Sequence, residues 1–143
     1  MPSNGFSVGR DVSLVITTPN GNLTLSGITG FSSKPMVTKL KSKLLDGTPK
    51  FGVIPDGWQG SFKLDRSDAS ADNYWAAQEA GYFNGQNQNA ATIYETIQEA
   101  DGSLTQWRYT GVILVLEDAG SYEGDKKVEQ SFSFEASKRI KVA

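Results

Sequence analysis

The amino-acid sequence predicts a mainly β protein: an antiparallel β-sandwich or barrel of about seven strands with one α-helix packed against it. Three observations lead to this prediction. Segments in which apolar and polar residues alternate recur along the 143 residues, and a period of two is typical of half-buried strands. Asn-Gly and Asp-Gly pairs separate several of these segments. Only one stretch, near the middle, has helical periodicity, and the length favours a single domain over residues 1–143.

The chain is expected to open with a β-hairpin. The segments DVSLVIT and NLTLS flank Pro19-Asn20-Gly21. Asn and Gly both tolerate positive φ, which a tight two-residue turn between strands requires. The first two strands are therefore expected to pair with each other.

A third strand is expected at about residues 37–45, followed by a long loop excursion at about 46–57. Lysines share one face of this strand and apolar residues share the other, so one face is cationic and the other needs burial. The first face carries Lys39, Lys41 and Lys43, and the second carries Met36, Leu40 and Leu44. Asp46-Gly47, Pro49 and Pro55 form turns, which argues against a continued sheet. The excursion still contains apolar side chains that a free loop would leave in water: Phe51, Val53 and Ile54.

A short strand and the helix follow. SFKLD alternates cleanly, with Phe62 and Leu64 on one face. Ser67 or Asp68 is expected to cap the helix, because a short oxygen-bearing side chain accepts a hydrogen bond from a free amide of the first turn. Gly81 and NGQNQNAA are expected to end it. The helical spacing predicts an inward face made of Ala71, Tyr74, Trp75, Gln78 and Tyr82.

The second half of the chain is expected to be strand again. ATIYETIQEA and SLTQWRYTGVILVLE are separated by Asp101-Gly102, and KVEQSFSFEASKRIKV follows a polar loop. In this last segment the apolar Val128, Phe132 and Phe134 alternate with four polar residues. The polar face consists of Glu129, Ser131, Ser133 and Glu135.

The chain contains neither cysteine nor histidine. These two residues supply most general bases, activated nucleophiles and transition-metal ligands, so an enzyme here would have to use carboxylates, Lys or Tyr alone, and a thiolate metal site is not possible. We therefore expect no enzyme, no cofactor and no metal site. A carboxylate-based hydrolase is the enzymatic alternative, although no spacing predicts two acids across a cleft. No apolar run approaches the roughly 20 residues of a membrane-spanning helix, and MPSNGFSVGR lacks the apolar core of a signal peptide, so no membrane anchor is expected.

The net charge of −2 is unevenly distributed. Residues 12–45 contain no acid but several lysines, whereas residues 117–131 carry five acids against two lysines. Opposite patches on one small domain favour self-association, since complementary charge steers the orientation of partners. Solvated faces and loops explain the same pattern equally well. An acidic chain without clustered basic residues does not fit a nucleic-acid-binding domain.

The three tryptophans have two interpretations. A flat aromatic platform would make this a small β-sandwich module that binds a carbohydrate or a peptide. Core packing is favoured for Trp75, on the inward face of the helix, and for Trp107, which shares a strand face with Tyr109 and Ile113. Trp58 lies between glycines in an expected turn, so we expect it to be exposed, and exposed Trp is enriched at protein interfaces.

The stretch DGWQGSFKLDRSDASADNYW, residues 56–75, resembles the tail tube proteins of tailed bacteriophages. The resemblance extends to the length of the chain and to its β-rich layout with one central helix. Members of that family share a fold with the tube proteins of type VI secretion systems and phage-like bacteriocins. They form six-membered rings that stack into a hollow tube, with the sheet lining the channel and the helix outside.

The resemblance implies a structural protein of the virion tail, assembled in the cytoplasm of a bacterial host. Its main partner would be other copies of itself, joined by tape-measure and baseplate proteins and, in a contractile tail, by sheath proteins. Double-stranded DNA would pass through the tube without specific binding. The alternative from another class remains the small ligand-binding module described above.

Three groups of residues are candidates for these roles. Gly57 and Gly60 would let the chain turn sharply, and Asp65 and Arg66 would anchor the corner between strand and helix by a charge-assisted hydrogen bond, in preference to a catalytic role. The expected subunit or ring interface comprises Lys34, Lys39, Lys41, Lys43, Phe51, Val53, Ile54 and Trp58. Glu129, Ser131, Ser133 and Glu135 would line the channel and repel phosphate, or face solvent. The excursion would be mobile in the free subunit and ordered against a neighbour, unless it folds back on its own domain.

Overall fold

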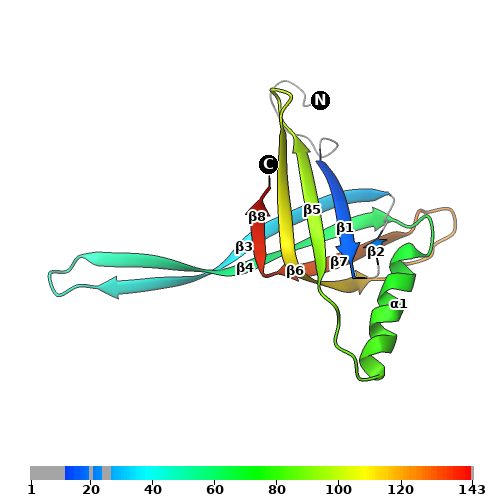
Figure 1. Cartoon of the computed structure of the whole chain (residues 1–143), viewed down its shortest axis with the longest axis horizontal. Helices are drawn as coiled ribbons and strands as arrows, with labels where there is room; N and C mark the ends of the chain where they lie inside the picture. The colour runs from blue at the N-terminus through cyan, green and yellow to red at the C-terminus, as the bar shows by residue number, and fades with distance from the viewer. Residues whose placement is uncertain (1–11, 20, 24–26, 143) are drawn as a thin grey trace.

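The structure, a computed structural model, describes residues 12–19, 21–23 and 27–142. It confirms a mainly β fold with one helix (Figure 1). The elements in chain order are β1 (Val12–Thr18), β2 (Gly21–Leu23), β3 (Ile28–Lys43), β4 (Pro49–Asp65), α1 (Ser70–Phe83), β5 (Ala91–Gln98), β6 (Leu104–Asp118), β7 (Glu129–Ala136) and β8 (Lys138–Lys141).

The strands form one antiparallel sheet in the order β2-β1-β5-β6-β7-β4-β3, and β8 also pairs with β6. In the part of the chain that the structure describes, this sheet does not close into a barrel. The predicted first hairpin is confirmed, with Thr18 opposite Gly21, whereas Asn20 and residues 24–26 lie outside the described residues. The last predicted strand is divided into β7 and β8.

Strand β6 belongs to both halves of the sheet. Its residues 104–112 pair with β5, and residues 113–118 pair with β7. The change of partner, between Val112 and Ile113, directly follows Gly111, whose φ is 64°. A Cβ at this position would come 2.5 Å from Ser137 Oγ, so glycine suits both the left-handed backbone and the close approach.

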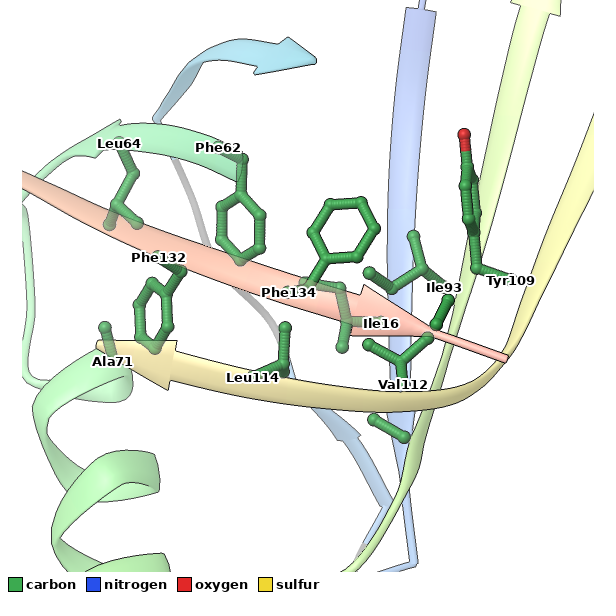
Figure 2. Packing of buried hydrophobic residues seen from close by; sticks show 12 residues of the cluster. Ile16, Phe62, Leu64, Ala71, Ile93, Tyr109, Val112, Leu114, Phe132 and Phe134 are labelled. Carbon is green, nitrogen blue, oxygen red and sulfur yellow. The ribbon is translucent and has the colours of Figure 1, made fainter. Parts of the chain in front are cut away.

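The core lies between these two halves of the sheet (Figure 2). Phe62 and Phe132 stack with ring centroids 5.2 Å apart, and Tyr109 meets Phe134 edge to face at 5.6 Å. All four side chains are almost fully buried. Aromatic side chains bury large apolar areas. The Phe62–Phe132 pair joins the neighbouring strands β4 and β7 within one half of the sheet, whereas the Tyr109–Phe134 contact holds the two halves together.

The predicted loop excursion at about 46–57 is wrong. Strand β4 already begins at Pro49 and pairs with β3 from Lys43 opposite Pro49 to Ile28 opposite Leu64. The outer part of this hairpin extends away from the domain and does not fold back on it (Figure 1). This outer part has only two strands, so each strand has one edge without a hydrogen-bonding neighbour. A proline whose missing N–H faces that edge removes no hydrogen bond of the sheet, and Pro49 and Pro55 are therefore compatible with a strand.

The helix begins later than predicted, but it ends at Phe83, immediately before the stretch NGQNQNAA that was expected to end it. Asp68 Oδ1 does accept a hydrogen bond from the Ser70 amide at 3.0 Å, but the helix starts at Ser70 itself and passes Gly81 to end at Phe83. Of the predicted inward face, Ala71 is buried and Tyr74 packs on the core, whereas Tyr82 is exposed. The helix thus packs against the sheet near its start. None of the described helices is long and apolar enough to cross a membrane.

Candidate assembly surface

The predicted interface residues lie mainly on the distal ribbon, which we define as residues 37–55 of the β3–β4 hairpin. Residues 49–57 of β4 have no described pairing with β7, so among the described strands β3 and β4 pair only with each other in the ribbon. Phe51 is 69% exposed and Val53 is 61% exposed, and Ile54 is also exposed. Apolar side chains of this size rarely gather on one free surface unless it meets a partner.

The pairing register fixes which ribbon residues share a face. Lys39 lies opposite Val53, and Lys41 lies opposite Phe51. Directly opposed residues of an antiparallel pair point to the same side, so the lysine face is also apolar. The prediction of one cationic face and one apolar face is therefore incomplete, because the β4 strand adds Phe51 and Val53 to the cationic side. The opposite face carries Leu40 and Ile54.

A β-bulge separates the ribbon from the rest of the sheet. Met36 pairs with Gly57 and Val37 with Pro55, which leaves Asp56 as the extra residue. The Asp56 carboxylate accepts a short hydrogen bond from the Thr38 hydroxyl. Gly57 has a φ of 113°, and a Cβ there would come 2.7 Å from the carbonyl oxygen of Ala136. Gly57 is therefore required by both its backbone conformation and its close packing.

Gly60 is also sterically required, but neither glycine forms the sharp turn that was predicted. Gly60 lies within β4, opposite Ser33 on one side and Phe134 on the other. A Cβ at Gly60 would collide with the carbonyl oxygen of Ser32 and would come 2.7 Å from the Phe134 ring. The predicted turn is instead part of strand β4, which has its bulge at Asp56 and is approached closely at Gly60 by β3 and β7.

Trp58 is half-buried in β4, so the prediction of an exposed turn residue is wrong. Its ring meets Tyr109 edge to face at 6.2 Å, and the Arg139 guanidinium lies 4.5 Å from its centroid. The same guanidinium lies 3.7 Å from the centroid of Trp107. A cation held between two indoles covers the aromatic surface that a sugar or peptide would need, and this disfavours the ligand-binding platform.

Arg139 also contacts the most deeply buried carboxylate of the described residues. Arg139 Nη2 lies 3.7 Å from Glu95 Oε1, and Glu95 is only 6% exposed. Burial raises the pKa of Glu95, while the charge of Arg139 opposes that rise. Burial likewise raises the pKa of Tyr109, whose hydroxyl lies 3.0 Å from Ser33 Oγ. The cluster joins β8 to β3, β4, β5 and β6 at the base of the hairpin.

Arg66 makes a charge-assisted hydrogen bond at the corner between strand and helix, as predicted. Its Nε donates to Asp72 Oδ2 in the first turn of α1 at 3.1 Å. Asp65 instead contacts the loop before β7, where Lys127 Nζ lies 3.3 Å from Asp65 Oδ1. Asp72 Oδ1 accepts a second hydrogen bond, 2.9 Å long, from the buried Gln130 of β7. Asp72 is thus the residue that links helix and sheet, and an acid at this place in the first turn also suits the helix dipole.

The predicted channel residues share one face of β7, as expected from their alternation. Glu129 and Glu135 are exposed, and Ser131 and Ser133 are half-buried. The residues between them point into the core. The register continues this polar face across β4 and β3, because Ser133 lies opposite Ser61, which lies opposite Ser32. The outer side of this half of the sheet is therefore a hydroxyl-rich surface with two glutamates along β7.

The end of α1 is a second exposed apolar surface, and the sequence prediction assigned one of its residues, Tyr82, to the interior. Phe83 is 76% exposed and Tyr82 is 69% exposed, with their rings 5.5 Å apart. Together with the half-buried Trp75 they border a shallow groove that also includes Gln78, Glu79 and Gln88. We call these six residues the aromatic groove. Among the described residues, no three His, Cys, Asp or Glu side chains are arranged to hold a metal ion.

No protein-family model matches this chain, and no curated protein matches it by sequence. Solved structures do match. A chain in the sheath-tube complex of an extracellular contractile injection system, PVC, in its extended state has a TM-score of 0.60 at 10% identity, covering 91% of this chain and 88% of that one. A chain in the 6-fold symmetrised baseplate of the anti-feeding prophage has a TM-score of 0.59 at 10% identity, with coverages of 100% and 98%. The SPP1 tail tube has a TM-score of 0.54 at 17% identity, with coverages of 94% and 78%. These structures confirm the fold that the resemblance to tail tube proteins implied.

Proposed function

We propose that this chain is a tail tube subunit that forms six-membered rings, and that the rings stack into a hollow tube through which double-stranded DNA passes. The shared fold supports this proposal, because the matched chains belong to a tail tube, a sheath-tube complex and a 6-fold symmetrised baseplate. Baseplate, tape-measure and, in a contractile tail, sheath proteins are the corresponding partners. The place of action would be the virion tail.

The observation that carries the proposal is the distal ribbon. A two-stranded ribbon is marginally stable on its own in water, and this one exposes apolar side chains on both faces. Contact with a neighbouring subunit or ring would cover those side chains and would supply the missing support. The interface residues on the ribbon are Lys39, Lys41, Lys43, Phe51, Val53 and Ile54, with Lys34 at its base.

Trp58 has a different role in this proposal. Its ring is held by Arg139 and Tyr109 inside the subunit, so it fixes the base of the hairpin and thereby the direction of the ribbon. The β7 face with Glu129, Ser131, Ser133 and Glu135 is the proposed channel lining. The register also places the exposed Lys63 opposite Ser131 and Lys34 in line with Glu135, so cations and carboxylates balance on this face. A face without net positive charge would let DNA slide past without being held.

Electron microscopy of the purified protein tests the assembly directly. Rings or tubes with six-fold symmetry are expected at high concentration or after addition of native tail components. Uniform monomers under both conditions, confirmed by sedimentation, would overturn the proposal.

Hydrogen exchange tests the role of the ribbon. Amides of residues 46–55 should exchange rapidly in the monomer and become protected on assembly, because the ribbon lacks a third strand until a neighbour covers it. The core strand β7 serves as the internal control, since it should be protected in both states. Strong and equal protection of residues 46–55 in monomer and tube would contradict a role for the ribbon in assembly.

A further inference from the structure

The aromatic groove at the end of α1 has no partner among the described residues that would explain it. The first turn of the helix is held to the sheet through Asp72, but Tyr82 and Phe83 at the other end are exposed. Figure 1 shows this end of α1 directed away from the sheet. A helix end that exposes two adjacent aromatic rings is expected to form part of a binding surface.

The charge around the groove restricts what that partner can be. Residues 67–107 contain no lysine and no arginine, and α1 itself carries Asp72 and Glu79. Glu79 lies in the groove beside Trp75 and Tyr82. The fitting partner is therefore apolar and positively charged, because a cation can pair with the carboxylate and also lie over an aromatic ring.

The distal ribbon has this composition. It carries four lysines, Lys39, Lys41, Lys43 and Lys50, against one acid, Asp46. Its lysine face combines Lys39 and Lys41 with the exposed Phe51 and Val53. Apolar contacts and charges thus match between two surfaces that both remain exposed among the described residues of the subunit.

The two surfaces cannot meet within one molecule. The distal ribbon extends from one side of the domain and α1 lies on the other side (Figure 1). We propose that the lysine face of the distal ribbon of one subunit binds the aromatic groove of a neighbouring subunit. This inference rests on the proposed function, because it names the surface that receives the ribbon in the assembly.

Such a contact is heterologous: each subunit gives its ribbon to one neighbour and receives a ribbon from another. Heterologous contacts propagate, either around a ring or along an axis, and so they suit a tube in which every subunit has the same surroundings. Lysine and glutamate set the orientation, and Phe51, Val53 and the groove aromatics provide the buried apolar area.

A charge exchange tests the pairing. Glu79→Lys should raise the critical concentration for assembly about tenfold at low salt, because it places a cation opposite the ribbon lysines. Adding Lys41→Glu to the same chain should restore most of the loss. Asp125→Lys is the matched control, since it makes the same change of charge at an exposed loop residue. Equal effects of Glu79→Lys and Asp125→Lys, or no restoration by Lys41→Glu, would overturn the inference.

Crosslinking provides a second, independent test. The chain has no cysteine, so Val53→Cys and Phe83→Cys can be introduced into separate chains and mixed before assembly. A short bismaleimide should then link the two variants into a heterodimer. Tyr122→Cys replaces Phe83→Cys in the control, because Tyr122 is an aromatic residue with 70% exposure elsewhere on the surface.

The outcomes separate the two proposals. Tubes that form but give no more Val53–Phe83 crosslink than the Tyr122→Cys control would overturn the ribbon-to-groove contact and leave the tube function in place. Wild-type protein that forms neither rings nor tubes would overturn both.

Discussion

Gly60→Ala probes how closely the strands approach at the base of the hairpin. A methyl group on Gly60 would meet the carbonyl oxygen of Ser32 and two ring atoms of Phe134, at 2.7 and 2.8 Å. Phe134 cannot move away easily, because it is 2% exposed, stacks on Phe31 at 5.6 Å and meets Tyr109 edge to face. The carbonyl oxygen belongs to the backbone of β3, which is itself paired with β4.

The expected cost follows from this lack of space. Overpacking a well-filled core by one carbon costs about 1–3 kcal/mol, and the upper value applies here because one of the obstructing atoms is backbone. For a domain of this size, about 3 kcal/mol corresponds to a fall in the melting temperature of roughly 6–12 °C.

Unfolding of the monomer by guanidinium, followed by tryptophan fluorescence, measures the effect. Gly30→Ala is the matched control: Gly30 lies in the adjacent strand β3, and a Cβ there would have nothing within 4 Å. It should be neutral or slightly stabilising, since alanine restricts the unfolded chain. If Gly60→Ala proves as stable as Gly30→Ala, the close approach of β3, β4 and β7 is not as described.

Three further predictions concern the cluster, the corner and the ribbon. Arg139→Leu should destabilise the fold by about 3–5 kcal/mol at pH 8, because it leaves the buried Glu95 without its cation. The loss of stability should shrink as the pH falls toward 5, because the raised pKa of Glu95 favours its protonated form in the folded state, and a protonated acid needs no cation. A loss of stability that does not depend on pH in guanidinium unfolding would contradict this. Gln130→Ala should cost about 2 kcal/mol and should lower hydrogen-exchange protection in α1 more than in β5, since Asp72 loses its partner on the sheet; unchanged protection of α1 would contradict that link. Reversing the charges of Lys39, Lys41 and Lys43 should weaken assembly, measured by sedimentation, and should reduce its dependence on salt. Unaltered assembly would exclude an electrostatic role for these lysines.

The sequence identified elements where one local pattern dominates. The alternation in β7 correctly separated the polar Ser131 and Ser133 from the buried Phe132 and Phe134, because a strand with one solvent face has a strict period of two. The tight first hairpin was also identified, since its turn chemistry lies within a few residues.

The prediction from alternation is wrong for the second half of β6 because of one residue, Gly111. Tyr109 points into the core, and alternation then predicts that Ile113 and Val115 do so as well. Instead the buried residues after Gly111 are Val112 and Leu114, because the left-handed conformation of Gly111 shifts the phase of the strand. A glycine within a strand pattern signals that a bulge is present, but it does not say on which side the alternation resumes.

The proposed interface residues were named from the sequence, but their arrangement in the hairpin was not predicted. Lysine and apolar residues between positions 34 and 54 were recognised as a surface that needs a partner, yet Pro49 and Pro55 suggested a loop. The register with β3 decides which β4 residues join the lysine face, and register depends on the bulge at Asp56. Asp72 and Gln130 are 58 residues apart, so only the folded sheet brings them together.

The base of the hairpin explains how a ribbon without support of its own can still be directed at a neighbour. Strand β4 is held on both sides up to Trp58, where the Arg139 cluster and the close contacts at Gly57 and Gly60 leave little freedom. Beyond the bulge at Asp56, only one strand pairing remains. A rigid base therefore limits the directions that the ribbon can sample, which lowers the entropy cost of docking, while the ribbon itself can adapt to the surface it meets. This combination would suit the proposed docking of the ribbon on a neighbouring copy in one orientation.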